Sequence, residues 1–126
     1  MHPNEQVLRD ADKAQLDGDF EAFIDAFTDD VIVHIPGRSS LAGDYKGKEQ
    51  FGEIFAKFNE KAPNYTFDSH AYFADDEHGV TMQISNYGEP SGLVTNEAFI
   101  CHFRDGKISE FWFLSVDPYA VDELLG

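Results

Sequence analysis

The sequence contains little cysteine, little positive charge and no long apolar run, and each shortage excludes a class of protein. The single cysteine, Cys101, excludes an internal disulfide and a cysteine-based zinc site. No apolar stretch approaches the ~18 residues that a transmembrane helix needs. The first residues also lack the basic-then-apolar pattern of a secretion signal. We therefore expect a soluble, cytoplasmic protein.

Positive charge is scarce relative to negative charge. Nine Lys and Arg residues stand against 24 Asp and Glu residues, giving a formal net charge of −15. A surface with this balance repels phosphate backbones and anionic lipid headgroups. The composition therefore predicts neither nucleic-acid nor membrane partners.

Apolar and aromatic residues are plentiful. They include twelve Phe and five Tyr, and apolar residues make up 42 % of the chain. This is enough material for a packed core without disulfides or a structural metal. The length of 126 residues fits one domain, residues 1–126.

Helical spacing dominates the first half of the chain. Apolar residues recur every three or four positions in residues 4–17, 20–27 and 48–61, which predicts three helices. We expect Asn4 to cap the first helix and Asp19 to cap the second. A short β-branched strand at residues 31–35 and an exposed loop at residues 37–45 separate the second helix from the third.

From residue 64 onward the spacing changes to the alternation of β-strands. Strands are predicted at residues 65–74, 80–88, 93–104 and 107–116, followed by a short terminal helix capped by Asp117. Helices on one face of such a sheet make an α+β fold. We expect a strongly bent, mostly antiparallel sheet, curled into a cone-shaped barrel with the three N-terminal helices on its concave face.

Several local strings, in this order and spacing, resemble the SnoaL-like, ketosteroid-isomerase-like branch of the nuclear-transport-factor-2-like superfamily. The strings are Gly18-Asp19-Phe20, Phe27-Thr28-Asp29-Asp30-Val31, Pro36-Gly37, Gly43-Asp44-Tyr45-Lys46-Gly47 and Asp105-Gly106-Lys107-Ile108-Ser109-Glu110. The resemblance implies a cone with one apolar pocket for a small organic ligand. It does not imply one reaction, because the family includes cyclases, isomerases, epoxide hydrolases, dehydratases and non-catalytic binders.

The acidic and phenolic groups used by the best-known enzymes of this family are missing from the matching positions. The resemblance aligns the general-base Asp of the isomerases with Ile35, their oxyanion Tyr with Ala11 and their second oxyanion acid with Phe99. It aligns the acid of the cyclases and epoxide hydrolases with Phe113. Apolar side chains cannot stabilise a developing enolate, so these departures argue against ketosteroid isomerisation.

His34 and Glu97 are the candidate catalytic residues. The resemblance aligns His34 with a pocket-facing, water-orienting residue of the epoxide hydrolases, and histidine exchanges protons near neutral pH. We predict that its imidazole points into the cavity; the alternative is a half-buried histidine bonded to backbone. Strand alternation places Glu97 on the same face as Phe99, where burial would raise its pKa. The alternative puts Glu97 at the pocket mouth, solvated or paired with a cation.

The predicted ligand contacts flank the pocket or line it. They are Arg38, Tyr45, Phe55, Phe99, Phe113 and Ser115. Arg38 could clamp a ligand carboxylate or enolate, or be a surface charge. Tyr45 could donate a hydrogen bond from the rim, or anchor its loop. No spacing of histidines and carboxylates indicates a metal site, and we expect neither a metal nor a cofactor.

The outward residues of the last two predicted strands form an apolar stripe. They are Ile100, His102, Trp112, Leu114 and Val116. An exposed stripe of this kind favours a homodimer through the outer sheet face, although Trp112 could instead pack under the terminal helix. The sequence thus indicates a pocket protein for a small apolar compound. It is either a cofactor-independent acid/base enzyme (isomerase, cyclase, dehydratase or hydrolase) or a non-catalytic ligand-binding or dimeric interaction domain.

Overall fold

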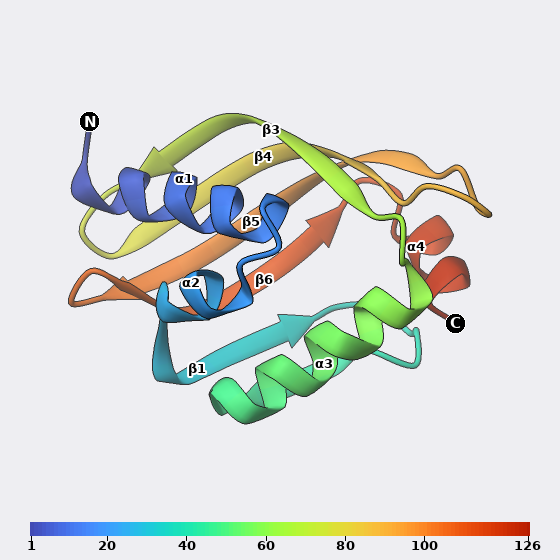
Figure 1. Cartoon of the computed structure of the whole chain (residues 1–126), viewed down its shortest axis with the longest axis horizontal. Coiled ribbons are helices and arrows are strands. Elements are labelled where there is room, and N and C mark those ends of the chain that lie inside the picture. The colour runs from blue at the N-terminus through green and yellow to red at the C-terminus, as the bar shows by residue number, and fades with distance from the viewer.

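The chain folds into a curved six-stranded sheet with helices on its concave side (Figure 1). The computed structural model describes residues 1–126. The helices are α1 (Pro3–Leu16), α2 (Phe20–Asp25), α3 (Gly47–Lys61) and α4 (Pro118–Leu125). The strands are β1 (Phe27–Ile35), β2 (Gly43–Lys46), β3 (Thr66–Ala74), β4 (His78–Asn86), β5 (Val94–Arg104) and β6 (Lys107–Ser115). None of the helices combines the length and the apolarity needed to cross a membrane. The predicted α+β class is confirmed.

The strands lie in the order β2-β1-β6-β5-β4-β3. Every neighbouring pair is antiparallel except β1 and β6, which run parallel. Register shifts between Ser69 and Ala71 and between His102 and Phe103 add local twist, which bends the sheet. The sheet curls into an open cone, since β2 and β3 remain its free edges.

Two details of the strands differ from the sequence prediction. The segment 37–45, predicted as a loop, contains the start of β2, an exposed edge strand without apolar alternation. In addition, β1 begins at Phe27, where a helix end was predicted, because Phe27 pairs with Ile108 of β6. Pairing with distant residues decided both outcomes, and no local spacing encodes it.

Helix caps follow the predicted chemistry at two of the three predicted sites. The carboxylates of Asp19 and Asp117 accept hydrogen bonds from the backbone N–H groups of Ala22 and Ala120. The predicted cap at Asn4 is wrong. His2 Nδ1 caps α1 instead, while the buried Asn4 amide donates to the carbonyls of Asp75 and Asp76 and so ties α1 to the β3–β4 turn.

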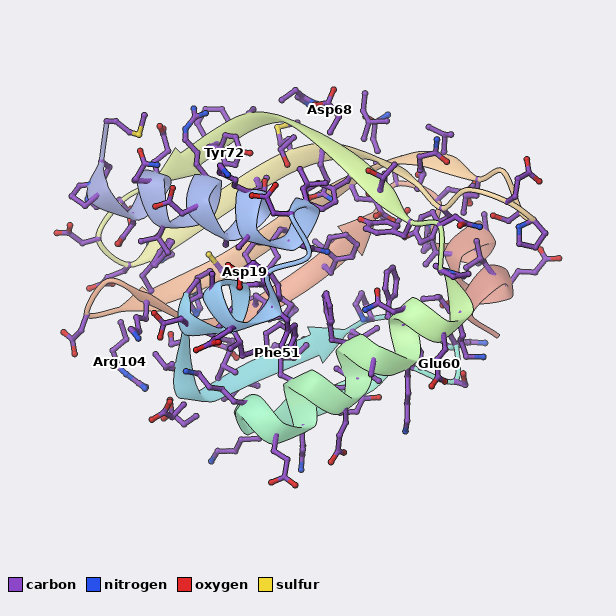
Figure 2. The ribbon with its side chains drawn as sticks, viewed as in Figure 1. Asp19, Phe51, Glu60, Asp68, Tyr72 and Arg104 are labelled. Atoms are coloured by element: carbon purple, nitrogen blue, oxygen red, sulfur yellow. The ribbon has the colours of Figure 1, made fainter.

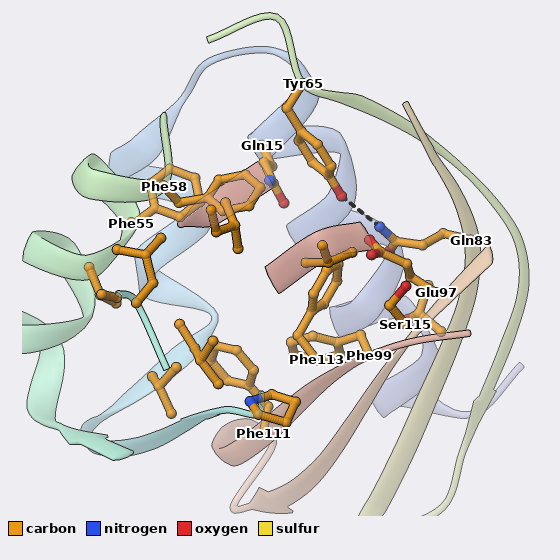
Figure 3. Close-up of a pocket in the computed structure, with 18 of the residues that line it drawn as sticks. Gln15, Phe55, Phe58, Tyr65, Gln83, Glu97, Phe99, Phe111, Phe113 and Ser115 are labelled. Carbon is orange, nitrogen blue, oxygen red and sulfur yellow. Dashed lines mark hydrogen bonds between the residues drawn. The ribbon is translucent and has the colours of Figure 1, made fainter. Parts of the chain in front are cut away.

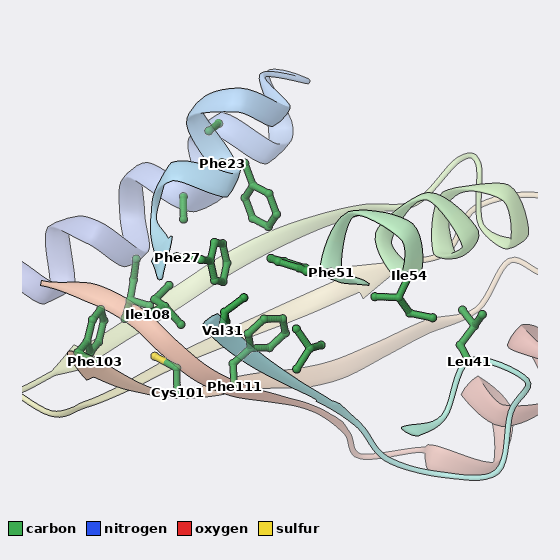
Figure 4. Packing of buried hydrophobic residues seen from close by; sticks show 14 of the residues in the cluster. Phe23, Phe27, Val31, Leu41, Phe51, Ile54, Cys101, Phe103, Ile108 and Phe111 are labelled. Atoms are coloured by element: carbon green, nitrogen blue, oxygen red, sulfur yellow. The ribbon is translucent and has the colours of Figure 1, made fainter. Parts of the chain in front are cut away.

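The core lies between the concave face of the sheet and the helices, which pack as two groups. Helix α1 packs against β3 and β4, and α3 packs against β1 and β2. Phe51 points from α3 into the molecule, whereas Glu60, Asp68 and Arg104 lie on the outside (Figure 2). Edge-to-face contacts join Phe27 to Phe23 and Phe51, with ring centroids 5.2 and 4.8 Å apart (Figure 4).

Candidate functional site

A cavity of about 180 Å³ remains between the helices and the concave face of the sheet (Figure 3). Nineteen of its 30 lining residues are hydrophobic. The lining residues that are exposed to solvent are Pro36, Gly37 and Pro118, so the cavity opens between the β1–β2 loop and α4. A dry apolar cavity of about 150 Å³ is sufficient for a benzene-sized molecule. The space therefore suits a compact ring compound.

Eight phenylalanines are among the lining residues of the cavity. Phe55 and Phe58 come from α3, Phe99 from β5, and Phe111 and Phe113 from β6. Phe99 and Phe111 pack with ring centroids 4.7 Å apart. Alternation groups Phe113 with Ser115, and the family resemblance assigns that group to the concave face, where both lie together with Phe99. Phe55 lines the cavity from α3. The role of these four residues in binding a ligand remains a prediction.

Polar side chains occupy one end of the cavity, in a row that crosses four strands. The registers align Ser69 of β3 with Gln83 of β4, Gln83 with Glu97 of β5, and Glu97 with Ser115 of β6. Because paired residues share a face of the sheet, all four project toward the helices. The cavity is thus amphipathic, with mostly apolar walls and hydrogen-bonding groups along one row.

Two tyrosines hold this row in place. The Gln83 Nε2 amide donates to the Tyr65 hydroxyl at 3.0 Å and to Ser85 Oγ at 3.1 Å, and Tyr65 and Ser85 are themselves 3.0 Å apart. The Tyr87 hydroxyl donates to Glu97 Oε2 at 2.7 Å. Burial, together with the nearby Glu97, raises the pKa of Tyr87 far above its ordinary value. Both phenols therefore remain hydrogen-bond donors at any physiological pH.

Glu97 is the most unusual residue of the cavity. Only 4 % of it is exposed, and its Oε1 has no hydrogen-bond partner. Burial raises the pKa of this carboxyl, and the facing hydroxyls of Ser85, Tyr87 and Ser115 offset only part of the rise. The alternative of a solvated or cation-paired glutamate at the mouth is therefore wrong. A buried carboxyl with a raised pKa is a candidate proton donor or acceptor.

Asp12 of α1 adds a second carboxyl to the cavity lining. Its Oδ2 accepts hydrogen bonds from Ser69 Oγ at 2.6 Å and from the Tyr72 hydroxyl at 2.8 Å. Burial raises the pKa of Asp12, and the two hydroxyl donors offset part of the rise. Because both hydroxyl donors belong to β3, Asp12 joins α1 to β3 as well as lining the cavity.

Replacing Glu97 with Gln is expected to stabilise the protein, and increasingly so as the pH rises. A carboxyl whose pKa is raised in the folded state binds more protons folded than unfolded, so stability falls with pH above the ordinary carboxyl pKa of about 4.3. Each unit of raised pKa corresponds to about 1.4 kcal/mol. Urea unfolding of both proteins between about pH 4 and about pH 8 measures the gap. The matched control is Glu60→Gln at an exposed residue, which should not change the pH dependence of the unfolding free energy. If the unfolding free energies of the native protein and Glu97→Gln changed with pH in parallel, Glu97 would not be a buried, unpaired acid.

The prediction that the His34 imidazole points into the cavity is wrong. In β1 the alternate residues Val33 and Ile35 line the cavity, so His34 projects from the opposite, convex face. There its ring stacks on Trp112 with centroids 4.7 Å apart and an angle of 13° between the planes. The position two residues before Pro36 is pocket-facing only if the strand keeps the family's parity, and here Ile35 takes the inward place. His34 is therefore not a candidate for chemistry in this cavity.

His34 instead joins two carboxylates on the convex face. Its Nδ1 lies 2.7 Å from Asp44 Oδ1 and its Nε2 lies 2.7 Å from Glu110 Oε2, while His102 Nδ1 lies 3.0 Å from Glu110 Oε1. Partial burial lowers the pKa of His34, but the hydrogen bonds and charges of Glu110 and Asp44 together outweigh it and raise the pKa. Both ring nitrogens of His34 face carboxylates, so the imidazolium form, which donates from both nitrogens, satisfies both hydrogen bonds.

The contribution of His34 to stability is expected to decline as the pH rises. Because its folded pKa is raised, the contribution is fully present below the unfolded value of about 6.5 and is lost as the pH rises through the folded value. The difference in unfolding free energy between the native protein and His34→Asn should therefore be larger at about pH 5.5 than at about pH 9. Taking the difference at each pH cancels the titration of Glu97 and Asp12. A constant difference would mean that the ring is neutral throughout.

Arg38 and Tyr45 do not line the cavity. The Arg38 side chain is exposed near the mouth, and its backbone N–H donates to Asp122 Oδ1 at 3.0 Å. The Tyr45 hydroxyl donates to the Leu41 carbonyl at 2.7 Å, so this ring anchors the β1–β2 loop. Of the alternatives left open by the sequence, the surface charge and the loop anchor are the ones observed. Cys101 is buried, and burial raises the pKa of its thiol to about 12.

Sequence reasoning missed eight polar lining residues, including Gln15, Ser39, Thr81 and Asp122. Four others contribute to the hydrogen bonds described above. They are Asp12, Tyr65, Gln83 and Tyr87. Asp12 had a usable signal, because it follows the apolar stripe of α1 at the same spacing as Leu8 and Ala11. Gln83 is a polar residue at an inward position of β4, but a single sequence does not show which parity of a strand faces inward.

Comparison with known proteins gives the family. Residues 8–111 match the SnoaL-like domain. The chain belongs to the SnoaL-like domain family. This SnoaL-like domain matches no curated protein. The sheet and cavity are therefore the scaffold of this family, while the identity of the ligand is left to the chain's own residues.

Solved structures share the fold of this SnoaL-like domain at low sequence identity. Bal32a, from a soil-derived mobile gene cassette, superposes with a TM-score of 0.90 at 22 % identity over 98 % of this chain and 97 % of its own. TerC, co-crystallised with polyporic acid, gives 0.86 at 18 % over 98 % of both chains. A Mycobacterium tuberculosis protein in complex with estradiol-17β-hemisuccinate gives 0.74 at 16 % over 94 % of this chain and 98 % of its own. These likenesses establish the fold alone.

Proposed function

We propose that the protein binds a small, largely apolar ring compound in the cavity and that Glu97 exchanges a proton with it. The observation that carries this proposal is a glutamate that is only 4 % exposed, lacks a partner on Oε1 and lines a mostly apolar cavity. A buried polar atom without a partner is unfavourable, so its retention is most readily explained by a ligand or a reaction.

The chemistry proposed for Glu97 is general acid/base catalysis on a carbonyl or hydroxylated compound. Burial raises the pKa of Glu97 above its ordinary value, which suits a group that must both take and return a proton. The Tyr87 hydroxyl at 2.7 Å holds the carboxyl in one orientation, and the aromatic walls keep water away. Isomerisation, aldol cyclisation and dehydration all proceed by such proton transfers and need no cofactor. Polyporic acid and the estradiol derivative held by two solved relatives are also ring compounds, which supports a ring-shaped ligand here.

Proton exchange on a cyclic ketone tests this role. We expect the protein to accelerate deuterium incorporation next to the carbonyl of 2-tetralone, followed by proton NMR, and Glu97→Gln to reduce the acceleration by about 10²–10⁴-fold. Gln preserves the shape and can still accept from Tyr87, so binding should persist. Equal exchange rates in the two proteins would remove Glu97 as the proton carrier. Binding of the ketone with no acceleration would favour the alternative, a non-catalytic ligand-binding domain.

We also propose that two copies associate through the convex face of the sheet. Exposed apolar side chains gather there on β4, β6 and the segment after β6: Met82, Ile84, Leu114 and Val116, with exposed fractions of 45, 42, 37 and 74 %. Trp112 and Ile100 lie beside them, half-buried. A two-fold interface would let one such patch cover the other. Screening at physiological salt weakens the long-range repulsion between chains of −15.

Trp112→Glu is expected to convert such a dimer to monomers. Buried interface tryptophans are typical hot spots, and losing one while adding a charge should weaken association by at least about 30-fold. Light scattering at micromolar concentration and moderate salt measures the mass. Leu16→Glu, on an exposed site of α1 away from the sheet, is the matched control and should leave the mass unchanged. A monomeric native protein would refute the proposed dimer without affecting the cavity.

A further inference from the structure

The charges around the cavity are all of one sign. Among its 30 lining residues the ionisable acids are Asp12, Glu97 and Asp122, and there is no Lys, Arg or His. The predicted clamp, Arg38, has its side chain in solvent. A ligand carboxylate or phosphate would therefore meet carboxyl groups at the mouth and at the polar row, without a cation to receive it.

Glu97 Oε1 is the one fully buried side-chain polar atom of this lining that has no hydrogen-bond partner. Tyr87 donates to Oε2, while Oε1 is buried without a partner. The Glu97 side chain lines the cavity near Ser115 (Figure 3). Gln83, which pairs with Glu97 from β4, donates its amide N–H groups to Tyr65 and Ser85. Within the protein Oε1 accepts no hydrogen bond, although the Ser85 and Ser115 hydroxyls lie near the carboxyl. A donor group on the ligand would complete it.

We infer that the ligand is an uncharged ring compound whose O–H or N–H group donates to Glu97 Oε1, and that the cavity rejects anionic head groups. This inference rests on the proposed function of the cavity and names its substrate class. A hydroxyl fits best, because it can donate to the carboxylate and accept from the protonated acid, and so matches Glu97 on either side of its titration. Like charges brought together in a water-poor site give the discrimination against carboxylates.

Three naphthalene compounds that differ only in their head group separate these statements. They are 2-naphthalenemethanol, its methyl ether and 2-naphthoic acid, titrated by calorimetry at about pH 7.5. We expect the alcohol to bind about tenfold more tightly than the ether, which cannot donate to Oε1. The naphthoate should bind at least about 100-fold more weakly than the alcohol, because it brings a second carboxylate beside Glu97.

Glu97→Gln assigns the discrimination to one side chain. In this variant the ratio of the affinity for the alcohol to the affinity for the naphthoate should fall by at least about tenfold, because the negative charge nearest to the naphthoate is gone. The control Glu123→Gln makes the same change of charge at an exposed residue of α4. It should leave the preference for the alcohol over the naphthoate unchanged. A preference that survives intact in Glu97→Gln would overturn the assignment.

The outcomes distinguish this inference from the proposed function. Equal affinities of the native protein for the alcohol and the naphthoate would overturn the inference and leave the cavity's binding function standing. Equal affinities for the alcohol and the ether would overturn the donor requirement. Failure of all three compounds to bind would count against the proposed function itself, and the inference would fall with it.

Discussion

Replacing Phe27 with Ala is expected to lower the free energy of unfolding by about 3–5 kcal/mol. Phe27 is 1 % exposed and lies where α2, α3, β1 and β6 meet, with its ring against Phe23, Phe51 and Phe111. Three aromatic neighbours held by separate elements cannot all collapse into the vacated space, so a cavity should remain. Urea unfolding followed by circular dichroism measures the loss.

The matched control for Phe27 is Phe73 on β3, which is 59 % exposed. Phe73→Ala removes the same atoms from a site that is mostly in water, so the change should be within about 0.5 kcal/mol. Similar losses at the two positions would show that the cluster around Phe27 does not form the main core. A natural domain has only about 5–15 kcal/mol of stability, so Phe27→Ala should remain measurable but marginal.

The second large effect is expected at Phe113, in the wall of the cavity beside the polar row. Phe113→Asp removes an aromatic contact and adds a carboxylate diagonal to Glu97 across β5 and β6, where Phe113 pairs with Phe99 and Ser115 pairs with Glu97. Binding of 2-naphthalenemethanol, followed by calorimetry, should weaken by at least about 100-fold, since an unpaired charge makes the wall polar and draws in water.

Two further variants isolate the cause at Phe113. Phe113→Leu keeps the wall apolar and should weaken binding by no more than about tenfold. Asn59→Asp adds the same charge on the exposed face of α3 and should leave affinity unchanged. If Asn59→Asp weakened binding as much as Phe113→Asp, net charge rather than the cavity wall would be responsible.

Much of this architecture could be predicted from the spacing of apolar residues. The stripe of Phe51, Ile54, Phe55 and Phe58 predicts α3 because those side chains share one helical face, and alternation around Phe111 and Phe113 predicts β6. The same alternation places Glu97 on the same face of its strand as Phe99. These predictions succeed because one buried face imposes one period on each element.

The polar end of the cavity and the orientation of His34 were beyond such reasoning. Alternation says which residues of a strand share a face, but it does not say which face is buried when both carry apolar residues, as in β1 with Ile32, Val33 and Ile35. The row from Ser69 to Ser115 exists only through the registers of four strands. Register is a property of long-range pairing, so a single sequence does not show it.

The central claim is that this cavity binds an uncharged ring compound with its donor group on Glu97. The most direct measurement is a crystal structure of the protein with 2-naphthalenemethanol. We predict the rings between Phe55, Phe99 and Phe113, and the hydroxyl oxygen about 2.5–3.0 Å from Glu97 Oε1. Density for the compound elsewhere, or in the cavity with its hydroxyl turned away from Glu97, would contradict the account.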